Sequence, residues 1–276
     1  IDTAGTTLGV SGANEAKRVQ KEYMQNHRLN IPTLLMADII HGFRTIFPIP
    51  LALGSTWDEA AVEKMAEISA KEAAVSGLHV TFSPMVDLVR DPRWGRVMES
   101  TGEDPLLNSR LAAAMVRGYQ GENLKEDNWR VAACVKHFAA YGGALAGRDY
   151  NTVDMSERQL REMYLPGYKA GLDAGAKLVM TSFNTVDGIP ATGNQWLFRD
   201  VLRNEFGFEG VVISDWGAIK ELIPHGVAKD EKQAAELAIK AGVDIEMMTT
   251  CYPDYLKELL EEGRISATLI DEAVMR

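Results

Sequence analysis

The sequence contains 276 residues, 46% of them hydrophobic and 8% aromatic, which suffices to bury a full core as one large α/β domain or two small ones. Its formal net charge of −10 at pH 7 argues against nucleic acids and anionic membranes as partners, because both bind basic surfaces. A neutral ligand fits this charge better. There is no apolar run of membrane length and no signal-peptide pattern. The chain opens on Ile1 rather than Met, so we expect a chain trimmed at its ends, from a cytoplasmic or a secreted or periplasmic protein.

Short aliphatic runs alternate with longer amphipathic segments along the chain, which is the pattern of a β/α repeat. Each run is too short for a stable helix and predicts a parallel strand that is buried on both faces. The six predicted strands are residues 33–37, 79–83, 131–137, 177–182, 211–214 and 243–247. No convincing first strand precedes Gly9.

Capping residues mark the beginning of three of the intervening helices, at Asp104, Ser156 and Asp230. Pro166 is expected to kink the second of these helices, because proline has no N–H to donate. Gly242 is expected to end the third, because glycine favours the left-handed conformation that follows a helix.

Such alternation fits either a barrel of eight β/α units or an open doubly wound sheet. The chain has neither the Gly-x-Gly-x-x-Gly turn of a dinucleotide site nor the Gly-x-x-x-x-Gly-Lys loop of a nucleoside triphosphatase, so no cofactor is implied. Polar residues follow directly on the predicted strands, namely Asp38, Lys136 with His137, Asn184 and Asp215. A parallel barrel gathers these strand ends around one pocket. We therefore expect an α/β fold, a (β/α)8 TIM-type barrel that is incomplete at one or both ends, as a single domain over residues 1–276.

Two of these strand ends carry side chains that suit a sugar. Asp38 can accept two hydroxyl hydrogen bonds, although an Asp at this position can also simply form a turn. Lys136 and His137 are consecutive and rarely buried without partners, so a functional role is favoured over a structural one. At a strand terminus the backbone turns, and both side chains can then reach one cavity.

The loop over residues 90–96 has three arginines around Trp94, followed by acidic residues. We expect one arginine to bind hydroxyls and two to form salt bridges within the loop. Asp215 ends a short buried strand beside Trp216. From that stretch alone a helix cap or an ion pair with Arg is the simpler interpretation, and Trp216 offers a flat face that can pack or bind a sugar ring.

The ordered motifs resemble a known family. They are Asp-Ile-Ile-His-Gly at 38–42, Arg-Asp-Pro-Arg-Trp-Gly-Arg at 90–96, Lys-His-Phe at 136–138, Arg-Asp-Tyr at 148–150, Met-Thr-Ser-Phe-Asn at 180–184 and Ser-Asp-Trp at 214–216. Together they resemble the N-terminal barrel domain of glycoside hydrolase family 3, in its β-glucosidase branch. The loop after Lys-His-Phe reads Ala-Ala-Tyr-Gly, which departs from the Pro-Gly-His-Gly of the family's β-N-acetylglucosaminidase branch.

The resemblance implies a retaining, exo-acting β-glucosidase that forms a covalent glycosyl-Asp intermediate, with Asp215 as the catalytic nucleophile. It implies that further residues bind the substrate: Asp38, Arg96, Lys136, His137, Trp216, Met180 and Phe183. Phe183 stands where many members have Tyr. Lys136 is expected to keep Asp215 ionised, because a neighbouring cation favours the charged form. The implied ligand is a β-glucoside or an oligosaccharide.

A retaining glycosidase needs a second carboxyl group as acid/base. Glu99, Glu103 and Glu246 are the acidic residues expected nearest the pocket, and none has a setting that clearly raises its pKa. Members that resemble this chain take the acid/base Glu from a following α/β domain, which we expect to be a missing part of the same protein. The chain alone is then expected to hold a sugar pocket and a nucleophile with little turnover.

Other functions stay open at this point. A β-xylosidase or an exo-β-glucanase shares the same framework. Outside hydrolysis, Lys136 could act as the Schiff-base lysine of an aldolase. Asp38, His41 and His137 could bind a metal, although metal ligands usually lie closer together in sequence, and we predict no metal site. The chain could also be a carbohydrate-binding barrel without catalysis.

Overall fold

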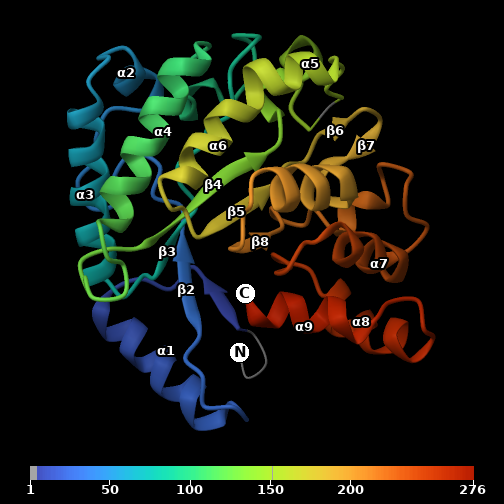
Figure 1. Ribbon diagram of the computed structural model, residues 1–276. Helices are drawn as coiled ribbons and strands as arrows, with labels where there is room; N and C mark the ends of the chain where they lie inside the picture. The colour runs from blue at the N-terminus through green and yellow to red at the C-terminus, as the bar shows by residue number, and fades with distance from the viewer. Residues whose placement is uncertain (1–4, 151) are drawn as a thin grey trace.

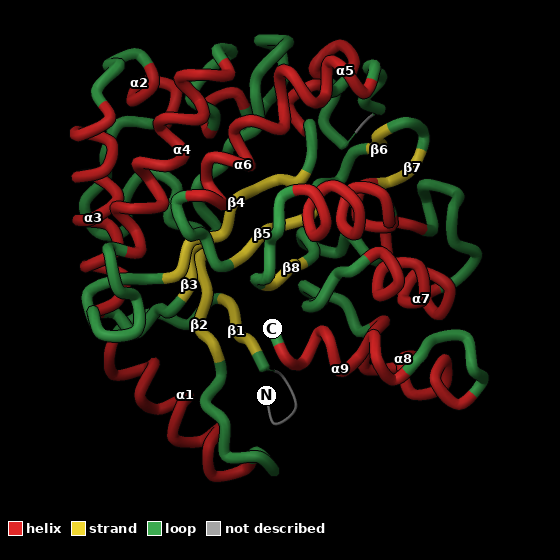
Figure 2. Tube along the Cα trace, viewed as in Figure 1, coloured by secondary structure: helices red, strands yellow, loops and turns green. Residues whose placement is uncertain are grey.

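The computed structural model describes residues 5–150 and 152–276 (Figure 1). At its centre is a curled six-stranded sheet in the order β1-β2-β3-β4-β5-β8, in which every neighbouring pair is parallel. Its strands are β1 (Thr6–Leu8), β2 (Leu34–Ala37), β3 (Val80–Thr81), β4 (Ala132–Phe138), β5 (Leu178–Thr181) and β8 (Val211–Ile213). A separate antiparallel hairpin joins β6 (Thr185–Val186) to β7 (Ile189–Pro190). Figure 2 shows the sheet strands in the middle of the molecule with the helices around them, which is the architecture of an incomplete β/α barrel.

The helices alternate with the strands and cover the outside of the sheet. The longer ones are α1 (Ala13–Asn26), α3 (Glu59–Val75), α4 (Pro105–Gln120), α6 (Leu165–Asp173), η6 (Trp196–Glu205), α7 (Glu231–Ala241), α8 (Cys251–Glu261) and α9 (Ala267–Met275). Shorter ones are α2 (Pro50–Gly54), η1 (Val97–Glu99), η2 (Tyr141–Gly143), η3 (Leu145–Gly147), α5 (Glu157–Gln159), η4 (Leu160–Tyr164), η5 (Ala191–Gly193) and η7 (Lys220–Leu222). Helix α4 packs between α3 and α6, as Figure 1 shows. Within the described part of the chain, no helix is both long and apolar enough to span a membrane.

The three predicted helix caps are confirmed. The carboxylates of Asp104 and Asp230 and the hydroxyl of Ser156 each accept a hydrogen bond from a main-chain N–H three residues further on. Gly242 ends α7 with φ 107° in the left-handed region. Just before Pro166, where a kink was predicted, the helix contains the π-helical turn η4, in which the N–H of Leu165 bonds to the carbonyl of Leu160.

Five of the six predicted strands are confirmed, as β2, β3, β4, β5 and β8. The prediction of a sixth strand over residues 243–247 is wrong: this segment runs beside β8 and forms a single bridge, between Ile213 and Ile245. Side chains interrupt the ladder there. The Asp244 carboxylate accepts the N–H of Val212 at 2.8 Å, and the Ser214 hydroxyl accepts the N–H of Met247 at 2.8 Å.

The expectation of no strand before Gly9 is also wrong. Strand β1 pairs in parallel with β2, with Thr6 opposite Leu34 and Leu8 opposite Met36. It has three residues, and all are half-buried. So short and polar a run acquires strand structure through its neighbour rather than through its own hydrophobic pattern.

Inside the curl of the sheet, side chains from successive strands pack on one another. This interior cluster contains Met36, Val80, Phe82, Cys134, Leu178, Met180, Ile213 and Met247. Because alternate strand residues share a face, the next inward positions beyond this cluster are Asp38 after Met36, Lys136 after Cys134 and Asp215 after Ile213. The apolar interior therefore forms the floor beneath a ring of charged side chains.

Candidate active site

The carboxyl ends of the strands surround a cavity of about 420 Å³. It is lined by Leu8, Gly9, Met36, Ala37, Asp38, Phe82, Arg96, Lys136, His137, Tyr150, Met180, Phe183, Asp215, Trp216 and Met247. All eight of the residues that the sequence analysis assigned to the site are among them. Lys136 and His137 both line the cavity although they are consecutive, because the pairing of β4 with β5 shifts register between Val135 and Phe138.

Lys136 and Asp38 form an ion pair across the cavity. The Nζ atom of Lys136 donates to Oδ1 of Asp38 at 2.7 Å. The Lys136 side chain is 4% exposed and that of Asp38 is 63% exposed, so the cation sits in the wall and the carboxylate at the rim. Asp38 keeps lone pairs on its outer oxygen for a ligand hydroxyl. The ion pair of Lys136 is thus with Asp38, whereas the basic side chain in direct contact with Asp215 is His137.

Asp215 is held by the main chain around it. One carboxylate oxygen, Oδ1, accepts the N–H of Trp216 at 2.6 Å, and the N–H of Asp215 itself donates to the Thr181 hydroxyl at 3.2 Å. The other oxygen, Oδ2, is buried and has no hydrogen-bond partner among residues 5–150 and 152–276. It lies 3.4 Å from Nε2 of His137. The carboxylate is therefore fixed through one oxygen and leaves the other without a donor.

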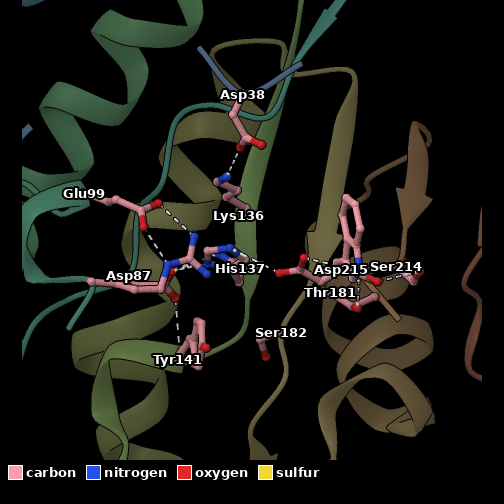
Figure 3. A network of polar contacts seen from close by, with 12 residues as sticks. Asp38, Asp87, Glu99, Lys136, His137, Tyr141, Thr181, Ser182, Ser214 and Asp215 are labelled. Atoms are coloured by element: carbon pink, nitrogen blue, oxygen red, sulfur yellow. Dashed lines mark hydrogen bonds and ion pairs between the residues drawn. The ribbon is translucent and has the colours of Figure 1, made fainter. Parts of the chain in front are cut away.

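His137 lies between two carboxylates, those of Asp87 and Asp215 (Figure 3). Its Nδ1 is 2.7 Å from Oδ2 of Asp87, a fully buried residue. Burial and then the charge of Arg96 lower the pKa of His137 well below its ordinary value, so the ring is neutral at neutral pH. Burial raises the pKa of Asp87 to about 6, although the hydrogen bonds that its carboxylate accepts act to lower it.

Asp87 was not predicted as a site residue. A signal was present: Asp87 is the one charged residue in the apolar run over residues 85–89. A buried carboxylate needs hydrogen-bond partners. Those of Asp87 are Tyr141 and Tyr168 as well as His137.

Arg96 supplies the guanidinium of the site. It binds Glu99 through two hydrogen bonds of 2.6 and 2.8 Å, and its guanidinium lies 5.5 Å from the centre of the Tyr141 ring. Burial alone would raise the pKa of Glu99, but the pair with Arg96 outweighs it and the pKa is lowered. Arg93 forms a salt bridge with Asp91 inside the loop, as expected for an arginine outside the pocket. Arg90 is exposed.

Aromatic side chains form one wall of the cavity. Tyr150 lies against Phe183, with ring centres 4.3 Å apart, and Trp216 is 59% exposed at the mouth. Tyr150 was part of a recognised motif but was not predicted as a site residue. Asn184 was grouped with the other strand-end polar residues, but it is buried outside the cavity lining and donates to the carbonyl of Ala139 at 3.2 Å.

The other acidic residues near the pocket are engaged elsewhere or lie outside its lining. Glu246 accepts the N–H groups of Cys251 and Tyr252 at the start of α8. Glu103 is exposed. Glu221 was not predicted: burial and the charge of Asp215 raise its pKa, yet it does not line the cavity.

The three residues weighed as metal ligands do not converge. His41 hydrogen-bonds the carbonyl of Phe47, while Asp38 pairs with Lys136 and His137 with Asp87. Across the described residues, no group of three or more His, Cys, Asp or Glu side chains is arranged to hold a metal ion.

The chain is similar to a known family and to curated proteins. The model of the family described as glycosyl hydrolase family 3, N-terminal domain, matches residues 5–276. A periplasmic beta-glucosidase of Salmonella typhimurium is 47% identical over 269 residues, which are 98% of this chain and 35% of that protein. A beta-xylosidase of Formosa agariphila is 36% identical over 91% of this chain and 38% of its own length.

Solved structures are similar over the whole chain. The beta-glucosidase of Listeria innocua in complex with glucose has a TM-score of 0.98 and 61% identity, and it covers 100% of this chain and 38% of its own. A mutant of that protein has been solved with laminaribiose. The chain spans 35% to 38% of the length of these relatives.

Proposed function

Since the chain belongs to glycoside hydrolase family 3, as its N-terminal domain, we propose that it supplies the sugar pocket and the nucleophile of a retaining, exo-acting β-glucosidase. The proposed reaction releases terminal non-reducing β-D-glucosyl residues through a covalent glycosyl-Asp215 intermediate. The observation that carries this proposal is Asp215 at the edge of the cavity, where a main-chain N–H fixes Oδ1 and no described residue donates a hydrogen bond to Oδ2. The names of the relatives support it, because those from Salmonella typhimurium and Listeria innocua are beta-glucosidases.

The proposed chemistry proceeds in two displacements. In the first, Oδ2 of Asp215 attacks the anomeric carbon, the glycosidic C–O bond breaks, and the leaving oxygen takes a proton from the acid/base carboxyl group. In the second, that group removes a proton from water, the water oxygen bonds to the anomeric carbon, and Asp215 is released as carboxylate. Two inversions give net retention.

The proposed contacts to the sugar come from the charged ring of the cavity. Asp38 accepts hydroxyl hydrogen bonds at the rim, while Lys136 and Arg96 donate charge-assisted ones from the wall. Trp216 offers an apolar face at the mouth. Below the ring, Met36, Phe82 and Met180 close the floor, so a chain of sugars has no exit through it. A closed floor supports exo action on a terminal residue.

We also propose that the acid/base Glu comes from a following α/β domain of the full-length protein. The described chain offers poor candidates for it: Glu99 is ion-paired with a lowered pKa, Glu246 caps a helix and Glu103 is exposed. The chain also spans only 35% of the Salmonella relative. On this proposal residues 1–276 form one catalytic barrel domain that turns over little substrate alone.

The stereochemistry of the first product tests the proposed reaction. The full-length protein is mixed with an aryl β-glucoside, and the anomeric protons of the released sugar are followed by NMR before mutarotation. Retention predicts that β-glucose appears first and that Asp215→Asn releases none. Initial α-glucose contradicts the proposed mechanism, and tight sugar binding without release favours a carbohydrate-binding barrel.

A β-xyloside is the second candidate substrate, because one relative at 36% identity is named a beta-xylosidase. Glucose and xylose differ by the 6-hydroxymethyl group, so kcat/KM for paired aryl β-glucosides and β-xylosides decides between them. An aldolase is not favoured. A Schiff-base lysine needs a free amine, whereas Lys136 Nζ is engaged by Asp38 at 2.7 Å.

A further inference from the structure

The buried carboxylate of Asp87 does not line the cavity, yet it is bonded to a residue that does. Its Oδ2 accepts the main-chain N–H of His137 at 3.0 Å and lies 2.7 Å from the Nδ1 of the same residue. Its Oδ1 accepts the N–H of Tyr141 at 3.2 Å and lies 2.7 Å from the hydroxyl of Tyr168, which also faces the carbonyl oxygen of His137 at 2.5 Å. Two of these partners are main-chain N–H groups, which can only donate. Figure 3 shows Asp87 on the side of His137 away from Asp215.

This set of donors determines the charge of Asp87. Hydrogen bonds to a carboxylate favour its ionised form, whereas burial opposes ionisation and raises the pKa of Asp87 to about 6. Asp87 is therefore an acceptor at neutral pH. Nδ1 of His137 must then carry a proton and donate it to Oδ2.

The second ring nitrogen of His137 follows from the first. Groups on several elements face the ring. Asp87 lies 2.7 Å from Nδ1, and four further side chains act through their charges, namely Arg96, Asp215, Lys136 and Glu99. Burial and the positive charge of Arg96 lower its pKa well below the ordinary value, so the ring carries a single proton at neutral pH. With that proton on Nδ1, Nε2 presents a bare lone pair toward Asp215.

We infer that Asp87 is a positioning residue that holds His137 protonated on Nδ1, so that Nε2 is an acceptor and Oδ2 of Asp215 receives no hydrogen bond from the protein. The inference rests on the proposed role of Asp215 as nucleophile. An N–H donor 3.4 Å from Oδ2 would engage the attacking oxygen, whereas a lone pair leaves it free. Two facing acceptors favour a ligand that places a hydroxyl between them and donates its proton to one. By fixing the proton on Nδ1 of His137, Asp87 thus favours binding of a hydroxylated ligand.

The first experiment uses the full-length protein and the rate at which a 2-deoxy-2-fluoroglucoside glycosylates Asp215. Asp87→Asn keeps the shape but turns one acceptor into an N–H₂ donor, which in either orientation faces a main-chain N–H of His137 or Tyr141. We expect glycosylation and kcat to fall on the order of 10²-fold with a much smaller change in KM. Glu236→Gln is the matched carboxylate-to-amide control, because Glu236 pairs with Lys240 on α7 away from the cavity; it is expected to label like the parent protein.

The labelling results distinguish failure of the inference on Asp87 from failure of the proposed function. If the parent protein labels Asp215 and Asp87→Asn labels it equally fast, the inference is overturned and the proposed function stands. If the parent protein shows no adduct at Asp215, the proposed function itself fails.

A second measurement is made on the parent protein and does not depend on the folding of Asp87→Asn. The parent protein is labelled with ¹⁵N-histidine, and the ring signals of His137 are assigned by comparison with His137→Gln. The inference requires a protonated Nδ1 and a bare Nε2 at pH 7. A proton on Nε2 at that pH overturns it.

Discussion

The Nζ atom of Lys136 lies 2.7 Å from Oδ1 of Asp38, and this contact joins the ends of β4 and β2 across 98 positions of sequence. The pair is unequal, because the cation is buried and the carboxylate is largely exposed. Replacing Asp38 is therefore expected to change the free energy of unfolding by a different amount from replacing Lys136.

Asp38→Ala leaves the buried Lys136 cation without its partner, so we expect a loss of about 1–3 kcal/mol in the free energy of unfolding. Lys136→Met leaves an exposed carboxylate in water and fills the wall with an apolar chain of similar length. We expect it to cost less than about 1 kcal/mol. Urea unfolding of both variants measures the difference, and an equal or reversed order contradicts this account of the pair.

Asp215→Asn is expected to lower kcat steeply and to stabilise the fold. The amide oxygen keeps the hydrogen bond from Trp216, so the N–H₂ group takes the position of Oδ2 and faces the bare Nε2 of His137. We expect kcat to fall on the order of 10³-fold or more, and the free energy of unfolding to rise by about 0.5–1.5 kcal/mol. Thermal and urea unfolding measure the gain. A loss of stability indicates that Nε2 already carries a proton.

Arg96→Lys keeps the positive charge but loses the two parallel hydrogen bonds to Glu99. We expect kcat/KM for an aryl β-glucoside to fall about 10–100-fold. Arg93→Lys is the matched control in the same loop, since the Arg93 side chain is exposed and, within residues 5–150 and 152–276, is paired with the nearby Asp91 alone. Equal losses in the two variants show that loop integrity, rather than sugar contact by Arg96, is responsible.

The Arg96–Glu99 pair also predicts a pH dependence. Burial opposes ionisation of Glu99, but Arg96 outweighs it and lowers the folded-state pKa below the ordinary value of 4.5. The pair's contribution to stability is then fully present above pH 4.5 and is lost as the pH falls through the folded-state pKa. The difference in unfolding free energy between the parent protein and Glu99→Gln should be constant from neutral pH to about pH 5 and shrink below it. A difference that grows on acidification contradicts this sign.

Glu221 tests the proposal that the acid/base group lies outside this domain. Its pKa is raised, as an acid requires, but it does not line the cavity. We expect Glu221→Gln to affect aryl β-glucosides with good and with poor leaving groups to the same small degree. A loss confined to poor leaving groups assigns the proton donor to Glu221 and contradicts the proposal.

Much of the site could be predicted because the information is local. Asp38, Lys136 and Asp215 each stand at the end of a short apolar run, so the sequence locates them without knowledge of their partners. The helix caps at Asp104 and Asp230 depend on residues three positions away. Such patterns can be recognised in the amino-acid sequence alone.

The remainder depends on contacts between distant residues. Asp87 acquires its role from His137, 50 positions later, and from Tyr168, 81 positions later. The segment over residues 243–247 has the composition of a strand, but the Asp244 carboxylate takes a hydrogen-bonding position of β8 that a main-chain carbonyl would occupy. Strand β1 forms because β2 lies beside it. None of these relationships leaves a periodic pattern.

The central claim is that Asp215 is the nucleophile, and chemical trapping tests it most directly. A 2-deoxy-2-fluoroglucoside with a good leaving group is expected to form a stable adduct with the full-length protein, because fluorine slows hydrolysis of the intermediate more than departure of an activated leaving group. Proteolysis and mass spectrometry then locate the sugar. The account predicts one modified residue, Asp215, and no adduct in Asp215→Asn; attachment to any other side chain would contradict it.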